Sequence, residues 1–493
     1  MSRAASTADA AEVPPVMPVL PAPATRDPSP GGPDVTTTTG GRRHRIEDWR
    51  PEDPTFWRTT GAAIARRNLI FSVLSEHIGF SVWSLWSVLV LFLGPEYGID
   101  PAGKFLLTAV PTALGAVLRL PYTFAVGVFG GRNWTVISAA LLLLPTIPMA
   151  ILIEPGVSYQ TLMILACLAG VGGGNFASSM ANINQFYPDR HKGWALGLNA
   201  GGGNLGVPAV QLVGLLVLAT AGAAYPRLVP AVYLPLIVLA ALLAARHMDN
   251  ISPVAAGGGG STGVPSERGA MREVARDPHT WIMSFLYIGT FGSFIGFGFA
   301  FGQVLQVQFG DRFATPLDAA YLTFLGPLVG SLIRPFGGYL ADRLGGARVT
   351  CWNFVAMAVG ASVVLYASGR GSLPLYLVGF TSLFVFSGIG NGSTYKMIPA
   401  IFRARIRNAA GADPAPGGEL VRRAARLAGA LIGIAGAVGA FGGVLVNIAF
   451  RQSFLAYRSA DAAYVSFICC YLLCVLVTWA VYLRPSPRRL SGV

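Results

Sequence analysis

Twelve apolar runs, each long enough to cross a lipid bilayer, dominate the sequence. A transmembrane helix needs about 20 predominantly apolar residues. Only 12% of the residues are charged, about half the share usual in soluble proteins. We therefore predict an all-α membrane protein with spans near residues 68–93, 103–129, 134–153, 159–186, 194–220, 229–247, 279–309, 318–341, 349–368, 373–402, 427–451 and 463–483.

Positive residues alternate between rich and poor connections along the chain. The connections after spans two, four, six, eight and ten hold most of them, including Arg132, Arg190, Arg272 and Arg343. Because lysine and arginine mark the cytoplasmic side of a membrane, both termini are predicted to be cytoplasmic. The richness in Ala, Gly and Arg favours a bacterial cytoplasmic (inner) membrane. These loops account for the net charge of +13, so we expect no nucleic-acid partner.

The composition also divides the chain into segments. Residues 1–67 are predicted to be a largely disordered cytoplasmic tail with an interfacial segment near 46–67. Residues 248–278 contain Gly257 to Ser261, a glycine run typical of flexible linkers. The linker separates a six-helix half at 68–247 from a second half at 279–484, and 485–493 form a short cytoplasmic tail.

The two halves share an internal repeat. Gly115 and Arg119 in span two recur as Gly330 and Arg334 in span eight, at an offset of 215 residues. After span eight, the stretch from Gly338 to Arg348 is similar to the loop signature G-x-x-x-D-R-x-G-x-R, with one extra residue before the last arginine. Twelve helices in two pseudo-symmetric six-helix halves are typical of the major facilitator superfamily, whose substrates bind between the halves near the bilayer midplane.

Arg119 and Arg334 lie well inside their spans. An arginine at the centre of a transmembrane helix costs about 2.5–3.5 kcal/mol, and no carboxylate stands at symmetric mid-span positions to balance this pair. Two guanidinium groups facing each other across a pseudo-twofold axis predict a bound anion, and their fork geometry suits a small planar oxyanion. The alternative is that each arginine braces a helix against a carboxylate or backbone carbonyls.

Glycine-rich segments in spans four and ten also repeat. Glycine lets helices approach closely, so helix packing is the plainer interpretation of Gly172, Gly173, Gly174, Gly388, Gly390 and Gly392. Three asparagines in the same segments could instead donate hydrogen bonds to an oxyanion: Asn175, Asn182 and Asn391.

These segments resemble the two signatures of the nitrate/nitrite porter (NarK-type) family of the major facilitator superfamily. The first runs from Gly172 to Ile183 and the second from Gly388 to Thr394, which includes Ser393. The resemblance implies nitrate and nitrite as substrates, with Arg119 and Arg334 as the anion clamp. It also implies a hydrogen bond from Tyr287, aromatic walls at Phe80 and Phe291, and an amide from Asn175 or Asn182.

The coupling of transport stays open from the sequence. A purely cationic site favours nitrate/nitrite antiport, but Glu76 and His77 lie about two turns into span one. Both can change protonation state, so nitrate/proton symport through Glu76 and His77 is the alternative. A plainer interpretation is that Glu76 pairs with an arginine near the cytoplasmic interface.

Other function classes fit less well. The histidines are scattered without metal-ligand spacing and no Gly-Lys-Ser/Thr nucleotide loop occurs, so we expect no enzyme, no cofactor and no metal. A drug-exporting facilitator is a remote alternative, because two central arginines disfavour cationic drugs. A nitrate sensor without transport is another. The fold type is usually monomeric, with the lipid bilayer and the two anions as its expected partners.

Overall fold

The computed structural model describes residues 44–252, 267–313, 315–410 and 418–485. The predictions for the first 43 residues, for the glycine run from Gly257 to Ser261 and for residues 486–493 lie outside the described residues. Within the described part, twelve helices are long and apolar enough to span a membrane. The predicted number of spans and the all-helical class are therefore confirmed.

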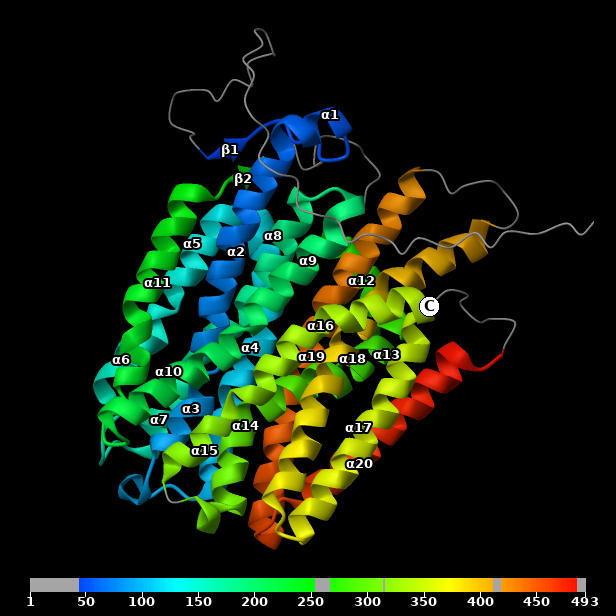
Figure 1. The fold of residues 1–493 in the computed structure, drawn as a ribbon. Coiled ribbons are helices and arrows are strands. Elements are labelled where there is room, and N and C mark those ends of the chain that lie inside the picture. The colour runs from blue at the N-terminus through cyan, green and yellow to red at the C-terminus, as the bar shows by residue number, and fades with distance from the viewer. Residues whose placement is uncertain (1–43, 253–266, 314, 411–417, 486–493) are drawn as a thin grey trace, which may run out of the picture. The chain divides into compact units, whose positions relative to one another are not determined.

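The first six spans run from residue 54 to residue 247 (Figure 1). Several of them are built from more than one helical segment. Their segments are α1 (Pro54–Phe56), η1 (Trp57–Gly61), α2 (Ala62–Trp83) and α3 (Trp86–Phe92) in span one, α4 (Pro101–Phe129) in span two, α5 (Gly131–Leu141) and α6 (Leu143–Leu152) in span three, α7 (Tyr159–Ala169), η3 (Gly170–Gly174) and α8 (Asn175–Phe186) in span four, α9 (Asp189–Asn204) and α10 (Gly206–Ala221) in span five, and α11 (Leu228–His247) in span six.

The second six spans follow a short helix, α12 (Glu267–Ala275), which lies within the predicted linker. Their segments are α13 (Pro278–Tyr287), η5 (Ile288–Gly292) and α14 (Ser293–Gln308) in span seven, α15 (Pro316–Thr323) and α16 (Leu325–Leu344) in span eight, α17 (Gly346–Gly369) in span nine, α18 (Leu373–Ala410) in span ten, α19 (Gly418–Tyr457) in span eleven, and α20 (Asp461–Thr478) and η7 (Trp479–Leu483) in span twelve. Short 3-10 turns, η2 (Pro95–Tyr97) and η6 (Gly310–Arg312), lie in two of the connections.

Local sequence explains where several helices begin. Asp100 caps α4 by accepting a hydrogen bond from the backbone N–H of Gly103 at 2.7 Å, and Pro101 follows at the first helical position. Ser158 caps α7 in the same way through the N–H of Thr161. Such caps satisfy backbone donors that have no partner inside the helix.

The repeat is visible in two turns. Gly130 between α4 and α5 has a φ of +84°, and Gly345 between α16 and α17 has a φ of +90°. These two glycines are 215 residues apart. Because side chains disfavour positive φ, glycine is needed at both turns, and the loop signature marks the same backbone shape in each half.

Several spans change their helical form along their length, and three of these changes lie near the predicted site residues. Span one breaks between α2 and α3, span four narrows to the 3-10 segment η3, and span seven widens to the π-helical segment η5. The last of these contains Phe291 and directly follows Tyr287. Such irregular turns are common at functional sites in helices.

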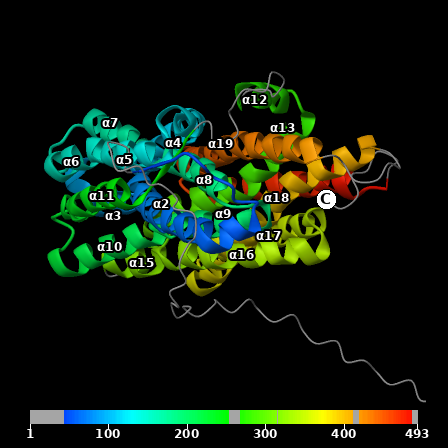
Figure 2. The same ribbon diagram turned by 90° about the horizontal axis from the view of Figure 1, so that it is seen from above.

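The two halves contact each other along α4 and α19 and along α10 and α15, as Figure 2 shows from above. Where α3 ends and α4 begins, side chains join the halves. Thr108 donates to Asn447 Oδ1 at 2.7 Å, and Gln303 donates to the carbonyl of Pro101 at 2.7 Å. We call this the joined end of the bundle. Deeper in the bundle, beside the start of α3, Gln211 donates to the carbonyl of Gly298 at 2.8 Å.

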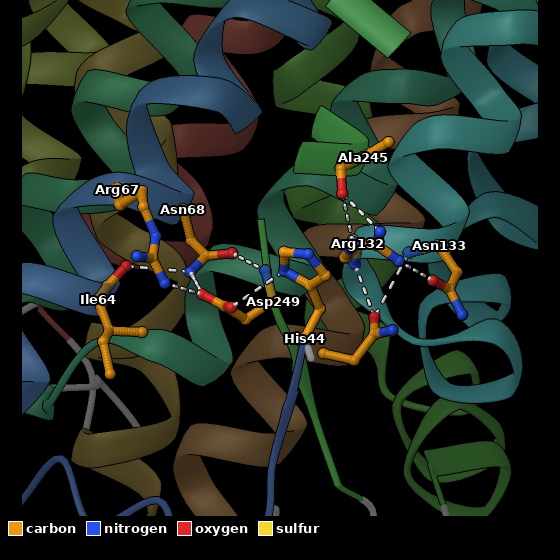
Figure 3. A network of polar contacts seen from close by, with 9 residues as sticks. His44, Ile64, Arg67, Asn68, Arg132, Asn133, Ala245 and Asp249 are labelled. Atoms are coloured by element: carbon orange, nitrogen blue, oxygen red, sulfur yellow. Dashed lines mark hydrogen bonds and ion pairs between the residues drawn. The ribbon is translucent and has the colours of Figure 1, made fainter. Parts of the chain in front are cut away.

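The opposite end carries a two-stranded parallel sheet, and we call it the strand end. Strand β1 (Arg45–Ile46) pairs with β2 (Asn250–Ile251), next to the start of span one (Figure 1). Asp249 accepts hydrogen bonds from Arg67 at 2.6 Å and from Asn68 at 2.9 Å (Figure 3). The chain ahead of span one is thus tied to the end of span six.

The expected interfacial segment near 46–67 has a different structure. Residues from Pro54 onward are helical and continue directly into α2, so span one begins earlier than the predicted residue 68. Trp57 is buried against Tyr187, and Trp49 donates to the carbonyl of Gln185 at 3.1 Å. These tryptophans therefore pack onto the end of span four.

Candidate functional site

Arg119 of α4 is fully buried between the halves. Its guanidinium carbon lies 4.6 Å from the ring centroid of Phe176 and 4.8 Å from that of Phe291. Nη1 donates to the carbonyl of Gly436 at 2.9 Å, whereas Nε and Nη2 have no hydrogen-bond partner among the described residues. Carbonyl bracing therefore accounts for only part of the hydrogen-bonding capacity of this arginine.

Arg334 of α16 approaches from the second half and is 6% exposed. Its Nη2 donates to the hydroxyl of Tyr287 at 3.3 Å, and its guanidinium carbon lies 5.8 Å from the ring centroid of Tyr395. Nη1 has no partner within the described chain. A donor of the second arginine is thus free as well.

Tyr287 and Phe291 connect the two arginines. Their rings stack with centroids 5.2 Å apart and planes 11° apart. Tyr287 touches Arg334, and Phe291 lies under Arg119. Each guanidinium group lies within electrostatic range of the other. The structure therefore brings together four of the residues predicted for the site, at the boundary of the two halves.

Several neutral polar groups in spans four and ten are also buried without partners in the described chain. Both side-chain amide atoms of Asn175 and of Asn391 lack a hydrogen bond among the described residues, as does the hydroxyl of Tyr395. Asn391 lies one helical turn before Tyr395, so the two share a face of α18. Buried polar atoms without partners are costly, and Tyr395, whose ring lies beside Arg334, is the one of these groups that the contacts bring to the arginines.

Two predicted site residues lie elsewhere. Asn182 packs against Gly131, at the turn between α4 and α5. The hydroxyl of Ser393 is 2.8 Å from that of Thr350. Of the two asparagines in the first signature, Asn175 therefore remains the better candidate for an amide near the arginines.

The signature glycines serve close packing, as the plainer interpretation predicted. A Cβ on Gly173 would lie 2.7 Å from the Cα of Gly115, and one on Gly388 would overlap the carbonyl of Gly330. Each of these pairs joins neighbouring spans of one half, and the two pairs are related by the 215-residue offset. Gly172, Gly174, Gly390 and Gly392 are similarly crowded, against Gly79, Tyr122, Thr290 and the carbonyl of Arg334 respectively.

The aromatic walls are more numerous than predicted. Phe80 packs edge-on against Trp83 and Phe176, and these two rings face Arg119. Phe176, Trp83 and Tyr395 were not singled out from the sequence. Phe176 directly follows Asn175 inside the first signature, which was the available signal, but its contact with Phe291 depends on how the halves pack.

No arginine among the described residues forms an ion pair with Glu76, in contrast to the plainer interpretation of this residue. Its Oε2 accepts a hydrogen bond from Asn199 at 2.6 Å, and its Oε1 has no hydrogen-bond partner among the described residues. His77 points elsewhere, with Nδ1 3.1 Å from the carbonyl of Gly202. Asn204, at the end of α9, is a further buried amide without partners in the described chain, and it was not predicted from the sequence.

The chain is similar to known transporters. The family model described as Major Facilitator Superfamily matches residues 77–445. The nitrate/nitrite transporter NarU of Salmonella typhimurium is 38% identical, over 91% of this chain and 98% of the relative. The probable nitrate/nitrite antiporter NarK2 of Thermus thermophilus is 33% identical, over 90% of this chain and 98% of the relative.

Among solved structures, the D-xylose-proton symporter has the same fold at a TM-score of 0.62 and 15% sequence identity, covering 84% of this chain and 97% of that one. The twelve helices and the bacterial relatives indicate a multi-pass protein of the inner membrane. The family model and the relatives together agree with the two glycine-asparagine signatures. The chain belongs to the nitrate/nitrite porter (NarK-type) family of the major facilitator superfamily.

Proposed function

We propose that this chain transports nitrate and nitrite across the bacterial cytoplasmic membrane, exchanging nitrate taken up for nitrite exported. The observation that carries the proposal is the pair formed by Arg119 and Arg334. They are buried, come from opposite halves, and leave three guanidinium nitrogens without protein partners in the described chain. The names of the relatives at 33–38% identity support the choice of anion.

The surroundings of the arginines favour a small planar anion. Phe176 and Phe291 approach the Arg119 guanidinium closely, which leaves its edge for hydrogen bonding. A guanidinium presents coplanar N–H donors that match the oxygens of a planar oxyanion. Tyr287 adds a hydroxyl that is already bonded to Arg334. In this proposal Phe80 and Phe291 wall the anion, and Asn175 and Asn391 supply amides.

Exchange follows from the charges of the empty site. Two guanidinium groups repel each other in a low-dielectric interior, so the two halves close more readily around an anion than around nothing. We propose that residues 68–247 and 279–484 rock against each other as two bodies around the bound anion. A nitrate brought in then returns the carrier with a nitrite, and no net charge moves.

The orientation follows from the basic residues. Arg67, Arg132 and Arg246 lie at the strand end, and positive residues mark the cytoplasmic side. We propose that the strand end, both termini and the linker at 248–278 are cytoplasmic and that the joined end is periplasmic. Because both arginines come from one chain, a monomer in the bilayer suffices for transport.

A test is ligand-dependent thermal stability of the purified protein in detergent. A ligand that binds only the folded state stabilises it by about 2.7 kcal/mol at 100 times its Kd. Nitrate and nitrite are expected to raise the Tm, whereas tetraphenylphosphonium, a lipophilic cation, is not. Arg119→Ala should abolish the nitrate effect. A Tm raised by the cation but not by nitrate would favour the drug-exporting alternative and overturn the proposal.

A further inference from the structure

Glu76 is a buried carboxyl group beside, but outside, the aromatic and arginine contacts of the proposed anion site. It is 1% exposed and lies in the middle of α2. Asn199 donates to its Oε2, and the same amide donates to the hydroxyl of Ser179 at 2.6 Å. An ionisable side chain inside a membrane span is costly and usually functional.

The charges that face Glu76 come from the second span and from the other half. Arg119 on α4 and Arg334 on α16 both lie within electrostatic range of its carboxyl, and Tyr395 on α18 does so as well. The neighbours from α8 and α9 are the neutral Ser179 and Asn199, and His77 on its own helix bonds to the carbonyl of Gly202. Glu76 is thus the single carboxyl group among these neighbours.

We propose that Glu76 is a proton site coupled to the anion site, so that the carrier can bind one proton together with each nitrate. The inference rests on the proposed binding of the anion by Arg119 and Arg334. With an ionised Glu76, the empty cluster of two arginines and one carboxylate has a net charge of +1. Binding an anion alone makes it neutral and brings two negative groups together, whereas binding an anion and a proton restores +1. Coupling of this kind is reciprocal, because each ligand favours the other.

The coupled proton gives the carrier a second mode. Nitrate/nitrite exchange needs no change at Glu76, because one monovalent anion replaces another. Net nitrate uptake without internal nitrite requires the empty carrier to return, and an ionised Glu76 offsets one of the two positive charges for that step. One nitrate and one proton then cross together, from the periplasm to the cytoplasm, and no net charge moves.

A line of polar side chains leads from Glu76 toward the proposed cytoplasmic end. Ser179, which is bonded to Asn199, lies 2.9 Å from the hydroxyl of Ser72. Asn68 is one helical turn before Ser72 on α2, and it donates to Asp249 at the strand end, as Figure 3 shows. Asp249 in turn is bonded to the half-exposed Arg67. This line makes the side of Glu76 that faces the proposed cytoplasmic end polar, and in the proposal Glu76 releases its proton to water on that side when the halves open there.

The test uses proteoliposomes that contain no internal nitrate or nitrite, with the acidic side on the outside. For a coupling of one proton to one nitrate, each pH unit supports about tenfold accumulation of nitrate. Glu76→Gln keeps an oxygen that can accept from Asn199 but cannot exchange a proton. We expect Glu76→Gln to lose the pH-driven accumulation and to keep nitrate/nitrite exchange. His77→Gln is the matched control and should behave as the wild type does.

The outcomes separate the inference from the proposed function. If the wild-type protein exchanges nitrate for nitrite but shows no pH-driven accumulation, or if Glu76→Gln accumulates nitrate as the wild type does, Glu76 is not the proton site. If the wild type exchanges neither anion, the proposed function itself fails.

A second measurement tests the inference on the wild-type protein, so that it does not depend on the folding of Glu76→Gln. When nitrate is added to the purified wild-type protein in weakly buffered detergent, the protein should take up about one proton per bound anion, provided that Glu76 is ionised at the start. Glu76→Asp, which retains a carboxyl group, should do the same. If nitrate binds but the protein takes up no proton at any pH between 5 and about 9, the inference is overturned.

Discussion

The guanidinium group of Arg119 lies over the face of Phe291, with its central carbon 4.8 Å from the ring centroid. The arginine belongs to the first half of the chain and the phenylalanine to the second. Phe291 is itself stacked on Tyr287, the hydrogen-bond partner of Arg334. Two stacked rings therefore lie between the two arginines, and the contact of Arg119 with Phe291 crosses the boundary between the halves.

Tyr287→Phe tests the hydroxyl that joins Arg334 to the site. The substitution keeps the stacking with Phe291 and removes a hydrogen bond of 3.3 Å. A hydrogen bond to a charged group contributes about 1.5–3 kcal/mol, so we expect the KM for nitrate to rise by about tenfold or more with little change in folding. Tyr321→Phe, at an exposed position, is the control. A KM equal to that of the wild type would exclude the hydroxyl from anion binding.

Arg334→Lys separates charge from geometry. Lysine keeps the positive charge but loses the planar fork of donors. Because hydrogen bonds to a charged ligand contribute about 1.5–3 kcal/mol, nitrate affinity measured by calorimetry should fall by about 10- to 100-fold. Arg370→Lys, on the surface beside Tyr366, should have no effect. Full affinity in the Arg334→Lys variant would mean that a point charge is sufficient.

Gly173→Ala tests the packing of the first signature. The added Cβ would lie 2.7 Å from the Cα of Gly115 and 2.8 Å from the ring of Trp83. Overpacking of this kind costs about 1–3 kcal/mol, so the Tm in detergent should fall and transport should weaken with it. Gly201→Ala is the matched control, since no other atom lies within 4 Å of its added Cβ. Equal Tm values for the two variants would contradict the packing interpretation.

Thr108→Val tests the joined end. The change removes the hydrogen bond from Thr108 to Asn447 across the halves and preserves the shape of the side chain. Losing about 1 kcal/mol should shift the population toward the state open at this end by about fivefold. Spin labels at Glu96 and Tyr457 in a cysteine-free background would report the shift as a longer distance. Thr220→Val is the control, because the Thr220 hydroxyl donates to the carbonyl of Leu216 in its own helix, and it should leave the distance distribution unchanged.

The sequence predicted the twelve spans and the arginine pair because both depend on local signals. Apolar length defines a span, and the 215-residue offset relates Arg119 to Arg334. Tyr287 and Phe291 came from the family resemblance, and the structure brings them to these arginines.

The parts that were missed depend on contacts between distant segments. Phe176 and Gly436 reach Arg119 from other spans, and no periodicity in span two indicates them. The partner of Glu76, Asn199, was missed because it is 123 residues away on α9. The start of span one was misplaced because Arg58, Arg66 and Arg67 interrupt the apolar pattern, although the backbone stays helical from Pro54 to Trp83.

The most direct measurement of the central claim is counterflow in proteoliposomes at equal pH on both sides. Vesicles loaded with excess unlabelled nitrite are diluted into a low concentration of isotopically labelled nitrate. The account predicts that labelled nitrate transiently accumulates above its external concentration, and that Arg119→Ala and Arg334→Ala each abolish this overshoot. No overshoot in the wild-type protein, or an undiminished overshoot in either arginine variant, would contradict it.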